Sequence, residues 1–232
     1  MSIKDQTDTK FTSIHKKYVI FQSTKQRSKG VTKVIKKVFF PGYSHRKLTG
    51  NYVRGLKPSK ARSNGKKIDS ELSECVGVEP IFPNNLLPET RHLLSYISRS
   101  GYFIESAQTP VGFAPWRLFT RIDLVLRPKN TNTNPDHRVA VEVKSGYANR
   151  KCSIKGKRSR FFNPPIEMSP LGLHKVQTLI GAELLRKCKP ELPVKKMLVY
   201  ISKDGVDVIK KIDIELTSIV TDALVRSSNK PS

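Results

Sequence analysis

The sequence predicts an α/β domain, and three observations point to that class. A chain of 232 residues, 37% of them hydrophobic, is long enough to bury one core of good size. Two segments, RIDLVLR at 121–127 and RVAVEVK at 138–144, alternate strictly, as strands with one apolar face do. The segment SPLGLHKVQTLIGAELLRK at 169–187 instead has apolar residues at helical spacing. Strands, a helix and a further strand together indicate a central mixed sheet flanked by helices.

The remaining elements follow from local signals. Pro88 suits the first turn of a helix that ends before Gly101, and Ser169 is a plausible N-cap with Pro170 at the first helical position of 169–187. The order of elements is therefore helix, three strands in an antiparallel meander, helix and strand. In chain order, the other predicted elements are strands at 103–110, 120–127, 138–144 and 195–202, a turn and a last strand within 203–212, and a helix at 214–226.

The N-terminal part differs in composition from the rest. Residues 1–67 contain 18 Lys and Arg against two acids, although the whole chain carries a net charge of +24. Because this part has few apolar residues, we expect 1–75 to be a basic arm that is largely extended or disordered. One folded domain should follow at 76–232. Two pieces of the arm, KYVIFQ and TKVIKKVFF, have the composition of short strands that dock on the domain.

The charge predicts a polyanionic partner, and nucleic acid is the first candidate. An anionic membrane surface and a solvated tail are the alternatives. No apolar run approaches the length of a membrane span, and the N-terminus lacks the apolar core of a secretory signal, so we expect an intracellular protein without a membrane partner. In a eukaryote, the basic arm would suit the nucleus or the mitochondrion. The sequence does not determine the oligomeric state.

Three cysteines, Cys75, Cys152 and Cys188, are an odd number at wide spacing. This pattern predicts reduced thiols in a reducing compartment, without a disulfide framework. Neither the cysteines nor the five histidines fall at the spacing of zinc ligands.

The alternating strands carry carboxylates at positions where an ordinary hairpin would have threonines. A period of two places Glu142 and Lys144 on one face of 138–144 and its valines on the other. In 121–127, Asp123 points away from the apolar face. If the two strands pair, Asp123 and Glu142 come close enough to share a cation. Mg²⁺ and Mn²⁺ prefer such oxygen ligands, the backbone carbonyl of Val143 could complete the set, and Lys144 could hold water or phosphate.

In these residues the chain resembles the PD-(D/E)XK nuclease superfamily, whose restriction-endonuclease-like fold has an αβββαβ core. Asp123 stands at the place of the family's first acid, and Glu142-Val143-Lys144 at that of its (D/E)-X-K triplet. Ile122 replaces the proline of the written motif. The resemblance covers about residues 84–202. It implies a metal-dependent nuclease with Mg²⁺ or Mn²⁺ as cofactor.

Several further residues are candidates for the same site. Gln177 lies within an apolar helical stripe, and it is either a core amide or, as the resemblance of HKVQ to phage-type recombination exonucleases implies, a group that reaches the active site. Glu89 is either an additional metal ligand, as in many family members, or a first-turn acid that favours the helix dipole. His174 and Lys175 either meet substrate phosphate or are simply exposed.

The loop SGYANRKCSIKGKRSRFFNPP, between the triplet and the helix, combines cations with aromatic residues. Cations contact phosphates and aromatic faces stack on bases, although a solvated loop would look similar. The predicted nucleic-acid contacts in this loop are Arg150, Lys151, Lys155, Lys157, Arg158, Arg160, Phe161 and Phe162.

The sequence thus predicts a nuclease that acts on DNA more than on RNA, with Asp123, Glu142, Lys144 and Gln177 as catalytic residues. The alternative is an inactive protein of the same fold that binds DNA or RNA within a processing or maintenance complex. A basic structural protein of a ribosome or virion would explain the charge but not the acids.

Overall fold

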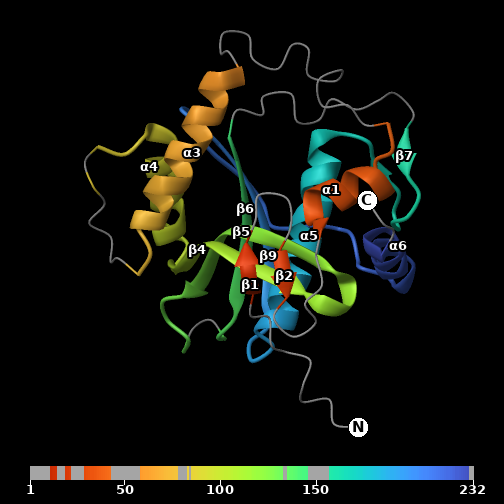
Figure 1. Ribbon diagram of the computed structural model, residues 1–232. Helices are drawn as coiled ribbons and strands as arrows, with labels where there is room; N and C mark the ends of the chain where they lie inside the picture. Colours follow the sequence, from red (N-terminus) through yellow and green to blue (C-terminus); the bar gives the residue numbers. More distant parts are fainter. Residues whose placement is uncertain are drawn as a thin grey trace.

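The computed structural model describes residues 11–14, 19–21, 29–42, 58–77, 83, 85–132, 135–145 and 157–229 (Figure 1). These residues form an α/β structure in which helices cover both faces of a mixed sheet. No helix among them combines the length and apolar character that crossing a membrane requires.

The central strands of the sheet are β5 (Leu118–Pro128) and β6 (Arg138–Ser145), which pair antiparallel. On the other side of β6 lies β9 (Val194–Ser202), which is parallel to it, so the chain crosses over through α5 (Pro170–Cys188). The outer strands are β4 (Tyr102–Phe113) and β10 (Gly205–Ile209), each antiparallel to its neighbour, and β3 (Lys29–Gly30), parallel to β5. A separate two-stranded sheet joins β1 (Phe11–Ile14) to β2 (Val19–Phe21).

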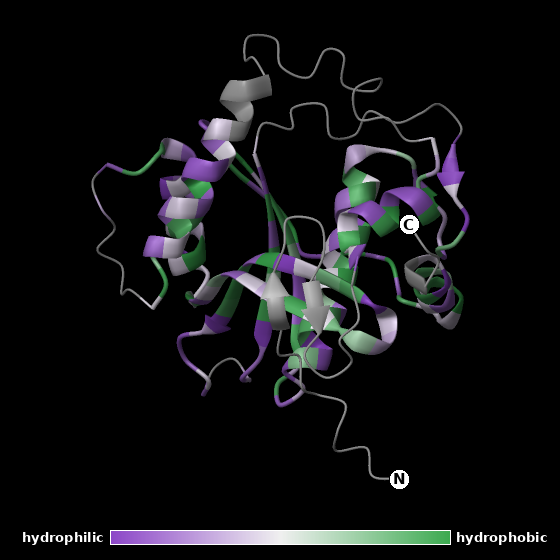
Figure 2. Cartoon of the chain, in the orientation of Figure 1, coloured by the Kyte–Doolittle hydropathy of each residue, from purple (hydrophilic) through white to green (hydrophobic). Residues whose placement is uncertain are grey.

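Each face of the sheet is buried in its own apolar cluster. One cluster joins Val139 and Val141 of β6 to α3 (Pro58–Glu74) and α4 (Pro88–Arg99), which lie to the left in Figure 1. The other joins Ala140 to α5, α1 (Val31–Val38) and α6 (Ser218–Asn229) on the right. Hydrophobic residues accordingly follow the central strands and α5 in Figure 2. We call these two faces the α4 face and the α5 face.

The predicted elements of the domain are confirmed with small shifts of their ends. The element order αβββαβ is present in α4, β4, β5, β6, α5 and β9. The Ser169 side chain accepts a hydrogen bond from the Gly172 N–H at 3.0 Å and caps α5, as its position predicted. The last helix begins at Ser218 rather than at 214, and residues 210–217 before it have no regular secondary structure.

The prediction of an extended arm is wrong for two segments of it. Residues 32–40, predicted as a short docking strand, lie mostly in α1, whose Val31, Val34 and Ile35 pack in the cluster of the α5 face. Residues 58–74 form α3, and its Ile68 and Leu72 pack in the cluster of the α4 face. A helix needs only a few apolar residues, three or four positions apart, to form an apolar stripe. In both segments this stripe packs on the domain, which supplies the rest of the core. The average composition of the arm conceals both stripes. In KYVIFQ, a strand is confirmed at Val19–Phe21.

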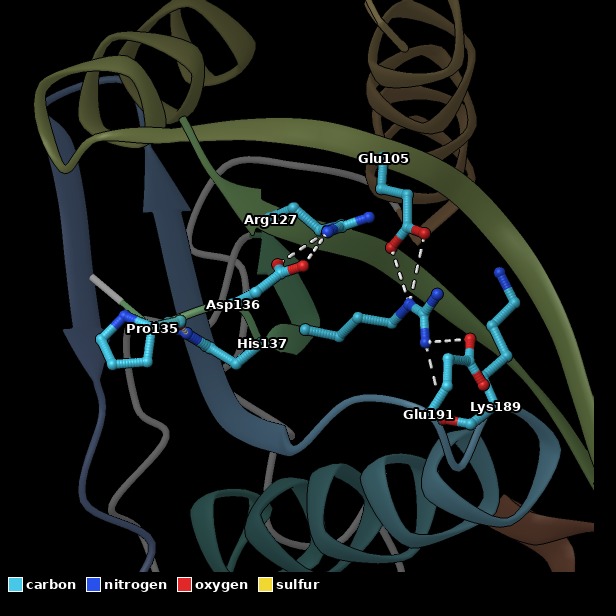
Figure 3. Close-up of polar contacts among 8 residues, drawn as sticks. Glu105, Arg127, Pro135, Asp136, His137, Lys189 and Glu191 are labelled. Atoms are coloured by element: carbon cyan, nitrogen blue, oxygen red, sulfur yellow. Dashed lines mark hydrogen bonds and ion pairs between the residues drawn. The ribbon is translucent and has the colours of Figure 1, made fainter. Parts of the chain in front are cut away.

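A cluster of paired charges holds the N-terminal end of β6 (Figure 3). The buried Arg138 donates from Nε to Glu105 of β4 at 3.0 Å, and its Nη1 pairs with Glu191 at 2.6 Å. Nearby, Arg127 of β5 pairs with Asp136 through two nitrogens. We call these five residues the Arg138 cluster. It ties β4, β5 and the α5–β9 connection to one end of β6.

Candidate active site

The carboxylates of interest lie toward the other end of β6, where its pairing with β5 stops. The ladder ends at the pair Leu124 and Val141, so Asp123 and Glu142 are the next opposing positions. Asp123 Oδ2 accepts the backbone N–H of Val143 at 2.8 Å. The side chain thus satisfies a β6 amide beyond the end of the ladder, and it is fixed beside Glu142.

Glu142 is buried and receives two donors from different elements. Its Oε1 accepts the ammonium of Lys144, two residues along the same face of β6, and the amide Nε2 of Gln177 at 2.6 Å. Gln177 comes from α5, which packs on this face of the sheet. The structure therefore brings Asp123, Glu142, Lys144 and Gln177 together.

The stripe that carries Gln177 explains how it reaches the strand. Leu173, Ile180 and Leu184 are buried one and two turns away on α5, as their helical spacing predicted. These residues seat the helix on the sheet, and Gln177 is half-buried between them. Its contact with Glu142 gives the amide a charged partner in place of the core carbonyl that a purely structural glutamine would use.

Negative charge exceeds positive charge at this place. Burial raises the pKa of Glu142 to about 7, and Asp123 and Asp69 add to the rise while Lys144 opposes it. Burial likewise raises the pKa of Asp123, against Lys144, the Val143 N–H and Gln108. One ammonium thus serves several buried carboxylates, and an additional cation would stabilise their ionised forms.

Two residues near the site were not predicted from the sequence. Asp69 of α3 has its pKa raised to about 6 by burial and then by Asp123, which brings it into the electrostatic surroundings of the site. The spacing of Ile68, Leu72 and Cys75 was the signal that could have placed it on a packed helix. Gln108 of β4 donates to Asp123 Oδ1 at 3.4 Å from a backbone with φ of 47°, a conformation rare outside glycine. No local signal predicts that conformation.

The other predicted site residues fall into different groups. Glu89 is buried in the first turn of α4, and no hydrogen bond or ion pair within the described residues joins it to Asp123 or Glu142. Its role as a metal ligand stays a prediction. The same is true of the Val143 carbonyl, because the contact seen at Val143 is made by its N–H.

Two predicted nucleic-acid contacts are wrong, because both side chains are buried. His174 is 3% exposed, and its Nδ1 lies 2.9 Å from the Tyr200 hydroxyl. Phe162 is 3% exposed and packs against Phe39, with 5.1 Å between ring centroids. Neither residue can reach a phosphate or a base without leaving the core.

The remaining loop residues divide between surface and undescribed segments. Lys157, Arg158 and Arg160 are exposed, Phe161 is 39% exposed, and Lys175 is half-buried on α5. Arg150, Lys151 and Lys155 lie outside the described residues.

The ligand atoms at this site are oxygens, the type that a hard divalent cation prefers. Asp123 and Glu142 offer carboxylate oxygens, and Mg²⁺ is commonly held by one or two carboxylates while it keeps several waters. Within the described residues, however, no three Asp, Glu, His or Cys side chains are arranged to hold a metal ion.

No protein-family model matches the sequence, and no curated protein matches it.

Proposed function

We propose that the protein is a Mg²⁺- or Mn²⁺-dependent nuclease that hydrolyses phosphodiester bonds, with DNA as the expected substrate. The observation that carries this proposal is the convergence on one end of β6 of Asp123, Glu142, Lys144 and Gln177, which come from three elements. The resemblance to the PD-(D/E)XK superfamily supports it, because the chain has the element order αβββαβ, with Asp123 on its second strand, Glu142 and Lys144 on its third, and Gln177 on the helix that follows.

Asp123 and Glu142 are the residues that would hold the ion. When bound, a divalent cation lowers the pKa of coordinated water and neutralises charge that builds up on the phosphate. The carboxylates are held in place beforehand, Asp123 by the Val143 N–H and Glu142 by Gln177. This preorganisation lowers the cost of reaching the reactive geometry.

Lys144 is the group best placed to act on the substrate. Its ammonium is paired with Glu142 and lies in a half-buried position, where an electrostatic contact is stronger than in water. From there it would orient the attacking water and stabilise the charge that develops on the phosphate. Attack on phosphorus breaks the bond to the leaving oxygen, and the products are a phosphate monoester and a hydroxyl.

The direct test is cleavage of labelled single-stranded, duplex and branched DNA, and of RNA, by the full chain with Mg²⁺, Mn²⁺ or EDTA. We expect metal-dependent cleavage that EDTA stops. Asp123→Asn and Glu142→Gln should each lower the single-turnover rate by at least about 10²–10³-fold, because each removes a charge that acts in the transition state. Lys144→Met should have a similar effect.

The matched control is Lys129→Gln, which removes an exposed charge just after the C-terminal end of β5. It should leave the cleavage rate within about threefold, and circular dichroism should show all variants folded. Wild-type cleavage by Asp123→Asn, Glu142→Gln and Lys144→Met would refute the proposal. Tight binding to nucleic acid without cleavage under any metal would instead establish the binding protein named above as the alternative.

A further inference from the structure

The helix α1 presents a row of lysines that the sequence placed in an extended arm. Lys33, Lys36 and Lys37 are exposed, whereas Val31, Val34 and Ile35 on the other side of the helix are buried against the core. Within the described residues, no carboxylate lies within ion-pair distance of these three lysines, and the first turn of α1 has no acid.

Positive charge is concentrated around this helix. The pKa of Lys29, just before α1, is lowered by burial and then by repulsion from Lys37, Arg117 and Lys33. Folding thus gathers cations that repel one another, and a polyanion would relieve the repulsion. In the hairpin of β7 (Arg158–Ser159) and β8 (Ile166–Glu167), by contrast, Arg158 has the acid Glu167 as its strand partner.

A buried aromatic contact joins α1 to the loop before α5. Phe39, the C-cap residue of α1, is 1% exposed, and its ring lies edge-on to Phe161 with centroids 5.2 Å apart. The last turn of α1, with Lys36 and Lys37, is thereby held beside Arg160 and Phe161. Phe161 nevertheless keeps 39% of its surface exposed. We call five exposed residues of α1 and this loop the α1 surface: Lys33, Lys36, Lys37, Arg160 and Phe161.

The α1 surface lies on the α5 face of the sheet, the same side from which Gln177 reaches Glu142. α1 packs on α5, and both helices contribute to one apolar cluster (Figure 1). A strand held on α1 would therefore lie on the same side of the sheet as the candidate site.

We propose that the α1 surface binds a single-stranded segment of nucleic acid, with its phosphates on the lysines and a base stacked on Phe161. Ammonium groups on a helix contact phosphates without reading sequence, and an exposed aromatic ring stacks on any unpaired base. A continuous duplex keeps its bases stacked inside and would use the lysines alone. This inference rests on the proposed function, because it takes nucleic acid as the partner. It adds that the bound nucleic acid is single-stranded.

Binding can be measured apart from chemistry, on the full chain carrying Glu142→Gln and in EDTA. The probes are a labelled oligothymidylate and a hairpin duplex of matched charge. Binding of each probe is measured by fluorescence anisotropy over a series of salt concentrations. Replacing Lys33, Lys36 and Lys37 together by Gln keeps helix propensity. We expect the Kd for oligothymidylate to rise about tenfold or more at low salt, and the slope of log K against log salt to flatten by up to about 2, at ~0.7 per lost contact.

The matched control removes three exposed lysines elsewhere, Lys129, Lys195 and Lys211. Lys129 and Lys195 belong to the opposite end of the sheet, since Lys195 pairs with Val139 of β6 and Lys129 follows β5. This variant has the same net charge as the α1 variant, yet it should keep most of the affinity and the salt slope. Equal losses in the two variants would show a general charge effect and overturn the proposal.

Phe161→Ala tests the single-stranded part. Loss of one stacked base, at about 1–3 kcal/mol, should raise the Kd for oligothymidylate at least about fivefold and leave the duplex nearly unchanged. Equal effects on both probes would overturn the stacking role. Vesicles with anionic lipid supply a last arm: if the α1 variant loses vesicle binding and keeps its affinity for oligothymidylate, the surface is a membrane contact and the proposal fails.

The two proposals can fail separately. If Glu142→Gln leaves cleavage intact, the active site is wrong but the binding result stands. If the α1 variant binds as well as the parent, the surface is wrong but the site at β6 is unaffected.

Discussion

The two ends of β6 both bury charged side chains, but they balance them differently. At the N-terminal end, Arg138 has two carboxylates, Glu105 and Glu191, which together raise its pKa although burial alone would lower it. The pKa of Glu191 is lowered, by its own backbone amide and then by Arg138. At the other end, burial raises the pKa values of Asp123 and Glu142, and Lys144, which is shared among several acids, opposes the rise only in part.

The polar groups around Arg138 also have protein partners. His137, which is 2% exposed, lies 2.6 Å from the Pro135 carbonyl through Nδ1 and 3.1 Å from the Tyr102 hydroxyl through Nε2 (Figure 3 labels His137 and Pro135). A buried polar cluster whose charges are matched stabilises a fold only modestly but is costly to break. A cluster with surplus negative charge costs stability, and such surplus is characteristic of functional sites. The comparison therefore separates an anchor from a candidate active site on a single strand.

The largest effect on stability is expected at the anchor. Arg138→Met removes the cation shared by Glu105 and Glu191 and leaves the partly buried carboxylate of Glu105 without its partner. We expect a loss of about 3 kcal/mol in the free energy of unfolding, measured by urea denaturation, with unchanged cleavage per folded molecule.

The control for Arg138→Met is Arg186→Met. Arg186 pairs with Glu183 on the exposed side of α5, and its loss should cost less than about 1 kcal/mol. If Arg138→Met were as mild as Arg186→Met, the description of the N-terminal end as an anchor would be wrong.

A smaller effect, on rate instead of stability, is expected at Gln177. Replacing it by Leu makes the apolar stripe of α5 continuous, so the melting temperature should hold or rise. The hydrogen bond to Glu142 is lost, and we expect the single-turnover rate at saturating Mg²⁺ to fall about tenfold. Both quantities should be measured on the same preparation.

Thr178→Val provides the comparison for Gln177→Leu. Thr178 is buried next to Gln177, but its hydroxyl donates to the His174 carbonyl within α5. This variant should change turnover per folded molecule by less than about twofold. Reduced stability with unchanged turnover in Gln177→Leu would mean that Gln177 is only a core amide.

The smallest expected effect is the pH dependence contributed by Asp69. Its pKa is about 6 in the folded protein against 3.8 for the ordinary group, so the folded state holds this proton more tightly than the unfolded chain. Stability from this group therefore falls as pH rises from about 4 to 6, and the cost persists above that range. Asp69→Asn should raise Tm by roughly 2–4 °C near pH 8 and by less near pH 4.

Asp136, which is paired with Arg127, provides the contrast to Asp69. Asp136→Asn removes this ion pair and should lower Tm slightly. A loss of stability at pH 8 in Asp69→Asn would contradict the surplus of negative charge near β6, because it would mean that Asp69 is stabilised as an anion.

Much of the fold could be predicted because its signals are local. The alternation of 138–144 placed its valines on one face, and they pack in the α4-face cluster; the positions of Ser169 and Pro170 fixed the start of α5. The neighbouring strand was harder. Ile122 packs on the α5 face and Leu124 on the α4 face, although both were predicted on one side, because the regular alternation does not persist through Asp123. Asp123, which lies between these two residues, accepts the Val143 N–H.

The sequence by itself determined which residue types carry the chemistry. The spacing of Glu142 and Lys144 puts them on one face of a strand, since side chains alternate with a period of two. The apolar stripe around Gln177 likewise requires that helix to pack against the sheet. These are properties of neighbouring residues, and they hold wherever the segment lies in the fold.

Only the tertiary structure decided which distant residues meet. The packing of α5 on the sheet buried His174 and allowed Gln177 to donate a hydrogen bond to Glu142. The position of α3 brought Asp69 near the acids. The contact of Phe39 with Phe161 holds α1 beside the loop before α5. Whether a polar side chain is exposed or buried depends on which element covers its face of the sheet. That choice is made by the fit and burial of apolar surfaces far apart in the chain, which no local spacing encodes.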